Sequence, residues 1–264
     1  MKVMPKDVLT HCFLPFLDGI DSIKYAMYHY KEYEEVLDLK HVNRIECEFT
    51  NTIVEFLVMC AHQGVYHEIR DINDATPLHL AKTSDQIKAL VYAGANMNIK
   101  NIKCKTPLHL AKTSDQIKAL VDAGADVNAV DGWGRNPLYF AKTTEQIKAL
   151  VDAGSDVNSV DGWGRTLLYF VETAEQTRIL INAGANVNTR DKDNNFTPLH
   201  TAKTAEQTRL LIKARADVNA RDNKGNTPLH YSETTEQTRV LIDAGANVNA
   251  RDKDDNTPSI NSFT

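Results

Sequence analysis

Histidine is the residue type of this sequence best suited to chemistry, because its imidazole can bind a metal ion or transfer a proton near neutral pH. The chain has nine histidines. Four of them end the same phrase, Thr-Pro-Leu-His, at positions His79, His109, His200 and His230. Each of these is alone in its own segment, and the other five have no cysteine or carboxylate at the spacing of a zinc site: His11, His29, His41, His62 and His67. We therefore expect no metal site and no cofactor.

The motifs of common catalytic sites are also missing from the sequence. There is no Gly-x-Ser-x-Gly turn, no His-Glu-x-x-His motif and no arrangement of paired carboxylates. Two glycine-rich stretches, residues 131–134 and 161–164, lack the lysine and the strand–loop–helix setting of a phosphate-binding loop. We predict that the protein is not an enzyme and has no catalytic residues.

Composition and charge narrow the class of protein further. Of the 264 residues, 42% are hydrophobic and 25% are charged, which is typical of a folded protein. A net charge of -5 argues against nucleic-acid binding by phosphate neutralisation, and no apolar run reaches the roughly 20 residues that cross a bilayer. The N-terminal residues lead into Asp7 and His11 instead of a cleavable apolar stretch, and the four cysteines show no metal-binding or redox spacing. We predict a cytoplasmic protein that contacts neither nucleic acid nor membrane.

A repeat of 30 residues dominates the sequence. The phrase Thr-Pro-Leu-His occurs four times, and altered copies begin at Asn136, Thr166 and Thr257. Successive copies are 30 residues apart, except for one step of 31 residues that falls in residues 191–196. Residues 76–91 and 106–121 are identical in sequence. A period this regular predicts an array of stacked units.

Each repeat carries the sequence signals of two helices. Thr106 and Pro107 begin the first helix, where proline in the first turn loses no hydrogen bond. Thr113 and Gln116 have the spacing of a capping box at the start of the second helix. Gly124 follows that helix and supplies the left-handed residue that ends it. The same signals recur in the other copies, so each repeat is predicted to consist of a helix, a turn, a second helix and a projecting loop.

The second helices are expected to supply much of the core. Leu120 and Val121 are predicted to form a buried ridge, which recurs in each copy. In the last three copies an isoleucine becomes threonine while an alanine two positions later becomes aliphatic, and this exchange is expected to keep the apolar volume of a packed interface. Arg215 replaces the glycine of the other full copies. A side chain at positive φ costs about 1 kcal/mol, so the fifth copy is a predicted weak point.

The phrases Thr-Pro-Leu-His and Gly-Ala-Asp-Val-Asn closely resemble the ankyrin repeat over residues 76–258. The resemblance implies an all-α solenoid, with six full repeats and a truncated seventh in residues 76–264. Ankyrin repeats usually have about 33 residues, and the three that are missing here fall between the two helices. This predicts a shortened first helix or a tighter turn. The resemblance also implies that the repeated histidines hydrogen-bond between neighbouring repeats, beside the threonine hydroxyl.

In ankyrin arrays a protein partner binds the concave side, which loop tips and first helices form. The predicted partner-binding residues are therefore at variable tips: Trp133, Arg135, Trp163, Arg165, Phe196 and Lys224. Trp133 and Trp163 each stand between glycines, so we expect them outside the core and side by side in adjacent repeats. Two interpretations stay open. They form a binding anchor, as tryptophan often does, or the second tryptophan is a relic of duplication of the third copy.

Upstream of the array, residues 1–45 are predicted to be a helical segment and residues 46–75 a degenerate repeat that caps the stack. Residues 4–37 are similar to an F-box, on the residues Met4-Pro5-Lys6-Asp7-Val8-Leu9 and Phe16-Leu17-Asp18, although Tyr33 stands where that family usually has tryptophan. The F-box family binds a Skp-type adaptor of ubiquitin ligases. The resemblance implies that six residues contact the adaptor: Met4, Pro5, Val8, Leu9, Phe13 and Leu17.

Proteins that combine an F-box with ankyrin repeats include effectors of host-associated microbes, and this resemblance implies action in a host cytoplasm. The sequence as a whole predicts a monomeric adaptor for protein–protein interaction, whose array binds a protein partner and whose F-box delivers it to an SCF-type ubiquitin ligase. The alternative is a plain ankyrin scaffold whose N-terminal helices only cap the solenoid.

Overall fold

The computed structural model describes residues 70–259, and all regular elements in that range are helices. This confirms the predicted all-α class. The chain divides into two compact units, Met1–Ala129 and Val130–Thr264. The F-box-like segment, most of the predicted capping repeat and all six predicted adaptor-binding residues lie outside the described residues.

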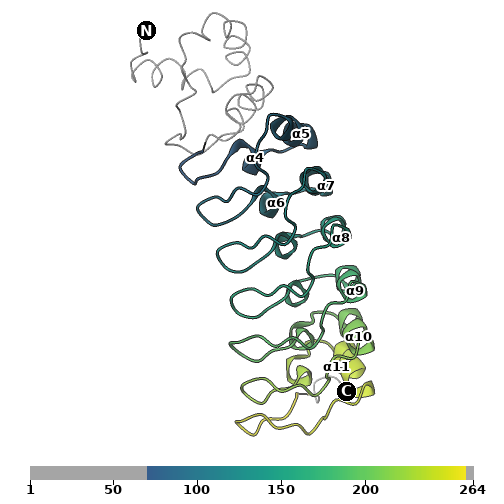
Figure 1. Cartoon of the computed structure of the whole chain (residues 1–264). Helices are drawn as coiled ribbons and strands as arrows, with labels where there is room; N and C mark the ends of the chain where they lie inside the picture. The colour runs from purple at the N-terminus through teal and green to yellow at the C-terminus, as the bar shows by residue number, and fades with distance from the viewer. Residues whose placement is uncertain (1–69, 260–264) are drawn as a thin grey trace, which may run out of the picture. The chain divides into compact units, whose positions relative to one another are not determined.

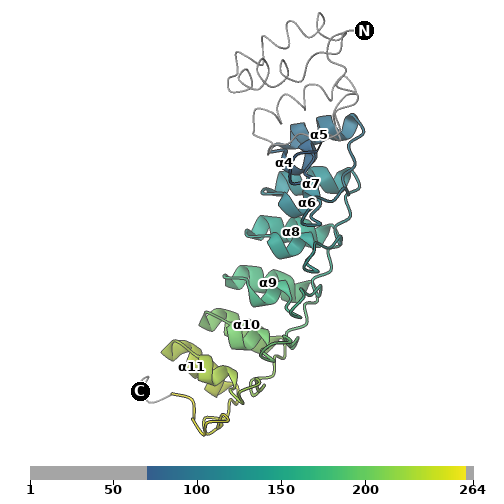
Figure 2. The ribbon, with the colours of Figure 1, turned by 90° about the vertical axis from the view of Figure 1, so that its left-hand side faces the viewer.

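Each repeat consists of a short first helix, a turn and a longer second helix, as Figure 1 and Figure 2 show. In the first unit α4 packs against α6 and α5 against α7; these helices are α4 (Pro77–Leu80), α5 (Ser84–Tyr92), α6 (Pro107–Leu110) and α7 (Ser114–Asp122). In the second unit the second helices pack in the order α8, α9, α10 and α11. Its elements are η4 (Pro137–Phe140), α8 (Thr144–Asp152), η5 (Leu167–Tyr169), α9 (Ala174–Asn182), η6 (Pro198–Thr201), α10 (Ala205–Lys213), η7 (Pro228–Tyr231) and α11 (Thr235–Asp243).

The first helix of a repeat is a single turn. In α6 the extended backbone of Thr106 (ψ 166°) precedes Pro107, and Ala111 (ψ 130°) is extended again after four helical residues. Only Lys112 then separates Ala111 from Thr113, the N-cap of the next helix. In the second unit the corresponding turns η4 to η7 are 3-10 helices. The predicted shortening of the first helix is confirmed.

In four of the described second helices, α7, α9, α10 and α11, a buried glutamine in the first turn ties the helix to the preceding repeat. The Gln116 backbone N–H donates to Thr113 Oγ1 (3.2 Å), and Gln116 Oε1 accepts the Thr113 N–H (3.1 Å), which is the predicted capping box. Gln116 Nε2 donates to the carbonyl of Ala81 at 3.0 Å, one repeat earlier. The same bond recurs in the second unit, from Gln176 to Lys142, from Gln207 to Val171 and from Gln237 to Ala202.

Each second helix ends at a left-handed residue. After α7 the N–H of Gly124 (φ +91°) donates to the Val121 carbonyl, and the N–H of Ala125 donates to the Leu120 carbonyl. These two bonds form a Schellman motif, which satisfies carbonyls that the helix leaves unpaired. Arg215 takes this position after α10 and has a φ of +69°. The predicted positive φ at Arg215 is confirmed, and its energetic cost stays a prediction.

The histidine of the first helix joins neighbouring repeats, as the family resemblance implied. His79 Nδ1 accepts the Thr76 backbone N–H (3.0 Å) and lies 2.9 Å from the Thr76 hydroxyl. Because Nδ1 is an acceptor, Nε2 carries the proton and donates to the Lys105 carbonyl of the next repeat at 3.0 Å. His200 and His230 make the equivalent bridges in the second unit. Burial lowers the pKa of His79 to about 4.

The apolar core contains one row of each second helix instead of the predicted ridge of two adjacent residues. Ile117 and Leu120 of α7 are buried, but Val121 is only partly buried, and Ile242 at the equivalent position of α11 is 39% exposed. The prediction was wrong for the second position of the ridge. Residues three apart share a helix face, whereas consecutive residues point about 100° apart. Leu120 therefore lies with Ile117, and Val121 turns away.

The expected exchange of apolar volume in the last three copies is also wrong. The threonines Thr177, Thr208 and Thr238 are fully buried, whereas the aliphatic residues two positions later are only partly buried. Gln207 Nε2 donates to Thr177 Oγ1 and Gln237 Nε2 to Thr208 Oγ1, both at 3.3 Å. The buried position thus exchanges apolar volume for a second hydrogen bond to the linking glutamine.

The bridge of His79 predicts a loss of stability in mild acid. The unfolded chain protonates this imidazole near pH 6.5, but the folded protein does so only near a pKa of about 4. The contribution is complete above pH 6.5 and falls as pH drops, by roughly 2 kcal/mol between pH 7 and pH 5. Urea unfolding midpoints at both pH values measure it. His79→Gln keeps hydrogen-bonding capacity without titrating and should lose this part of the dependence; an unchanged dependence would contradict the assignment.

The positive φ of Arg215 predicts that Arg215→Gly stabilises the protein by about 1 kcal/mol, because glycine adopts this conformation without strain. Thermal or urea unfolding checks this. The matched control is Gly184→Arg at the same position after α9, where φ is +88° and an added Cβ would meet nothing within 4 Å. That variant should lose a similar amount. Equal stabilities of wild type and Arg215→Gly would show that the left-handed residue is not strained.

Candidate protein-binding surface

The loops that lead into the first helices of the third and fourth repeats each close on a buried aspartate, and each loop is counted here with the repeat that follows it. Asp131 Oδ1 accepts the backbone N–H groups of Trp133 (2.9 Å) and Arg135 (3.1 Å). Its Oδ2 accepts Nε and Nη2 of the Arg135 guanidinium, at 3.1 and 2.8 Å. Asp161 makes the same four bonds in the fourth repeat. The sequence Asp-Gly-Trp-Gly-Arg therefore folds around its own first residue, and the tryptophan between the glycines turns outward.

Both aspartates are ionised at neutral pH. Burial raises the pKa of Asp131, but the hydrogen bonds from Arg135 and from the Trp133 N–H outweigh it and bring the pKa below its ordinary value. Burial likewise opposes ionisation of Asp161, and hydrogen bonds from Tyr139 and Arg165 lower its pKa overall. Two ionised partners in fixed geometry hold the guanidinium groups in place.

In the third repeat, the guanidinium held in this way lies among aromatic rings. The carbon of the Arg135 guanidinium is 4.9 Å from the centre of the Trp133 ring and 4.6 Å from that of Phe140. The same guanidinium carbon is 5.5 Å from the centre of the Tyr139 ring. These distances are within the range of cation–π attraction.

The fourth repeat repeats this arrangement and is joined to the third. Arg165 lies 4.9 Å from the ring centres of both Trp163 and Phe170, and the Phe170 ring is 5.1 Å from that of Tyr139. The loop backbones are also linked, since the N–H of Gly162 donates to the Trp133 carbonyl at 2.8 Å. We call the seven connected side chains the aromatic–arginine ladder: Trp133, Arg135, Tyr139, Phe140, Trp163, Arg165 and Phe170.

Tyrosines replace the bridging histidine in these two repeats. The Tyr139 hydroxyl donates to Asp161 Oδ2 at 2.6 Å. Burial and this bond to a carboxylate raise the pKa of Tyr139. The Tyr169 hydroxyl bonds the carbonyl of Phe196 at 2.8 Å and also contacts that of Thr189. Each tyrosine therefore keeps a link to the following repeat while carrying no imidazole.

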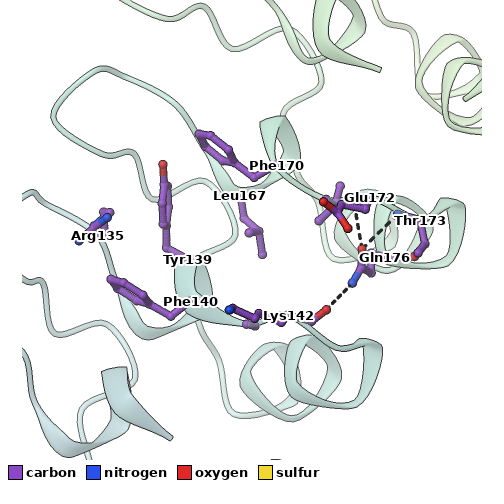
Figure 3. Close-up of a pocket in the computed structure, with 11 residues that line it drawn as sticks. Arg135, Tyr139, Phe140, Lys142, Leu167, Phe170, Glu172, Thr173 and Gln176 are labelled. Atoms are coloured by element: carbon purple, nitrogen blue, oxygen red, sulfur yellow. Dashed lines mark hydrogen bonds between the residues drawn. The ribbon is translucent and has the colours of Figure 1, made fainter. Parts of the chain in front are cut away.

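A groove lies beside the ladder, between the first helices of the third and fourth repeats (Figure 3). Its volume is about 560 Å³. Aromatic rings form one end, Leu167 lies between, and Gln176 is at the other end. The lining residues are Arg135, Tyr139, Phe140, Ala141, Lys142, Leu167, Phe170, Val171, Glu172, Thr173 and Gln176.

The structure brings four of the six predicted partner-binding residues together, and all four belong to the ladder: Trp133, Arg135, Trp163 and Arg165. The tryptophans are 44% and 41% exposed, which confirms their predicted place outside the core. The other two residues lie elsewhere. Phe196 stacks on His200, with ring centres 5.3 Å apart, and Lys224 is at the exposed tip of the sixth repeat.

Sequence reasoning missed three members of the ladder, Tyr139, Phe140 and Phe170. A signal was present when the repeats are aligned, because leucine follows the histidine at Leu80 and Leu110 where the third and fourth copies have phenylalanine. The loops that lead directly into these two copies are the ones that contain Trp-Gly-Arg, at residues 133–135 and 163–165. The coincidence of both changes marks the surface.

Other kinds of site are not found in the described part of the chain. No group of histidine, cysteine, aspartate or glutamate side chains in residues 70–259 is arranged to hold a metal ion. No helix in that range is both long and apolar enough to cross a bilayer.

Comparison with known proteins identifies the family. A family model described as ankyrin repeats, with three copies, matches residues 79–161 and 167–252. The chain belongs to the ankyrin-repeat family, whose members are interaction scaffolds that bind protein partners and are not an enzyme family. Among solved structures it is similar to the ankyrin repeat domain of Bcl-3, a member of the IκB protein family, with a TM-score of 0.60 and 26% identity over 70% of this chain and 92% of that chain. No curated protein sequence matches it.

The tyrosine at position 169 leaves one hydroxyl unsatisfied, and this predicts a stabilising substitution. Thr166 Oγ1 is buried without a hydrogen-bond partner in the described structure, so Thr166→Val should raise the free energy of unfolding by about 1 kcal/mol. The matched control is Thr106→Val, whose hydroxyl lies 2.8 Å from His109 Nδ1. Its loss should destabilise by about 1 to 3 kcal/mol. Chemical denaturation compares the two, and destabilisation by Thr166→Val would contradict the prediction.

Proposed function

We propose that this protein is an interaction adaptor whose array binds a protein partner through the aromatic–arginine ladder. One observation supports this most: Trp133, Trp163 and Phe170 are 44%, 41% and 40% exposed on adjacent repeats. Exposed apolar side chains that lie together mark interaction sites, and tryptophan and arginine are enriched among the residues that dominate binding energy. Phe196 and Lys224 of the following repeats extend the proposed contact surface.

The fixed arrangement of the ladder side chains favours a binding role for the tryptophans over the alternative that the second one is a relic of duplication. Arg135 and Arg165 are each fixed by two bonds to an aspartate, and each lies against a tryptophan ring. Side chains already held in one arrangement lose little conformational entropy when a partner binds. A duplication alone accounts for the second tryptophan, and it predicts no effect of either tryptophan on binding.

Replacement of both tryptophans by alanine tests the proposal. Partners captured from a cell extract by the intact chain are identified, and the affinity of each is measured by calorimetry for wild type and variant. We expect binding to weaken by at least about 2 kcal/mol, the usual threshold of a hot spot, with little change in melting temperature. The control replaces Tyr92 and Ile102, which are 88% and 65% exposed in the first unit. Equal affinities of the tryptophan variant and wild type would leave the tryptophans as a relic.

The F-box resemblance of residues 4–37 extends this proposal. We infer that the N-terminal segment binds a Skp-type adaptor and so delivers the partner of the array to a ubiquitin ligase, in the cytoplasm of the cell or of a host. The support is the sequence Met4-Pro5 with the apolar pair Val8 and Leu9. A plain scaffold, in which these residues cap the array, is the alternative.

Binding of a purified Skp-type adaptor to the full chain separates the two. Wild type should bind at micromolar concentration, and Leu9→Asp should abolish binding because it puts a charge into an apolar contact. Unfolding of the array in the same variant, followed by circular dichroism, would favour the cap. Failure of the wild-type chain to bind the adaptor would leave the plain scaffold.

A further inference from the structure

We propose that the groove between the third and fourth repeats binds an extended peptide segment that carries a bulky apolar residue next to an acidic residue. This rests on the proposed function as an interaction adaptor and specifies the chemistry of the partner at this surface. Three properties of the groove carry it: an apolar floor, a backbone of helices and turns whose N–H groups at Phe170, Glu172 and Thr173 are already paired, and a positively charged rim.

The floor of the groove fits large apolar side chains. Leu167 is 5% exposed and Val171 8%, whereas Phe170 above them is 40% exposed. A volume of about 560 Å³ is within the range of small-ligand sites, roughly 300 to 1,000 Å³. That space is open along one side and holds the side chains of a short peptide. Burial of such side chains against Phe140 and Phe170 supplies the hydrophobic part of the binding energy.

Several backbone groups along the groove are already paired. Gln176 Oε1 accepts the N–H groups of Glu172 (3.0 Å) and Thr173 (3.1 Å), and its Nε2 donates to the Lys142 carbonyl (2.8 Å). The dashed lines of Figure 3 show these bonds. The Phe170 N–H donates to the Leu167 carbonyl. Because these groups are paired and the groove is formed by helices and turns, it offers no strand edge to which a peptide could add, and we expect recognition through the side chains of the peptide.

The charge left on the rim is positive. Glu172 is 3.6 Å from Lys203, and Arg135 is 2.8 Å from Asp131, so these charges are paired. Lys142 is exposed, and none of the ion pairs formed within residues 70–259 includes it. A carboxylate on the peptide complements Lys142, even though the chain as a whole has a net charge of -5. Complementary charge of this kind selects among partners more than it adds affinity.

The second repeat provides a natural control. Lys112 holds the place of Lys142 in the repeat pattern, and Leu110 the place of Phe140. The lysine is thus present there without the aromatic side chains. If positive charge alone attracted acidic peptides, Lys112→Glu and Lys142→Glu would weaken binding equally.

The test is selection of a phage-displayed library of random peptides on the full-length chain, followed by fluorescence anisotropy with synthetic copies of the enriched sequences. We expect enriched peptides to share an apolar residue adjacent to aspartate or glutamate. Phe170→Ser should weaken their binding by about tenfold or more. Lys142→Glu should weaken it by about tenfold and improve binding of a peptide with lysine in place of the acid. Lys112→Glu should change neither. Circular dichroism checks that the variants stay folded, and Phe170→Leu, which keeps an apolar side chain, should bind better than Phe170→Ser.

No enrichment, enrichment without an acidic residue, or binding that is insensitive to Phe170→Ser would overturn the inference. The tryptophan pair distinguishes this failure from failure of the proposed function. If no peptide is selected but Trp133→Ala with Trp163→Ala still weakens a captured protein partner, the adaptor function stands and only the peptide chemistry of the groove is rejected.

Discussion

The buried amide of a glutamine in the second helix is the interaction on which stacking depends within each compact unit. Its oxygen caps the second helix, and its nitrogen binds a carbonyl of the preceding repeat, as Gln116 and Gln176 show. A repeat of 30 residues has only a single turn as its first helix, so little surface of that helix can pack. The glutamine side chain therefore couples the start of its own helix to the contact with the preceding repeat, because both use the same amide group. Leaving either end of this amide unpaired in the interior would cost about 1 to 3 kcal/mol.

This polar way of stacking leaves the side chains of the first helix free to differ between repeats. The core uses the leucine of the second helix, the isoleucine or threonine three residues before it, and the glutamine that precedes them. Phe140 and Phe170 can therefore replace leucine without loss of the stack. The proposed recognition surface lies at first-helix positions whose side chains are not needed for stacking.

Local features were predictable from the sequence, whereas contacts between repeats were not, apart from the histidine bridge that the ankyrin resemblance implied. The caps at Thr113 and Gly124 and the positive φ of Arg215 depend on a few neighbouring residues, which a repeated pattern states directly. The bond from Gln116 to Ala81 and the contact of Tyr139 with Phe170 join residues about one repeat apart, so they require the offset between successive helices. The wrong burial of Val121 has a different, local cause, because consecutive residues of a helix point about 100° apart and only Leu120 shares the face of Ile117. The ladder could be predicted only in part, at its tryptophan tips, because its middle lies on the first helices.

The exchange of histidine for tyrosine in the third and fourth repeats separates recognition from acid sensitivity. Repeats with a buried imidazole bridge must either lose it or hold it uncharged as the medium acidifies. Tyr139 and Tyr169 make their bridges through hydroxyls that remain protonated throughout this range, since burial raises the pKa of both. Acidification therefore acts on the bridges of His79 and His200, whose pKa values burial lowers, while the two repeats that carry the ladder keep their bridges. The exposed aromatic surface therefore lies on the two repeats whose bridges contain no imidazole.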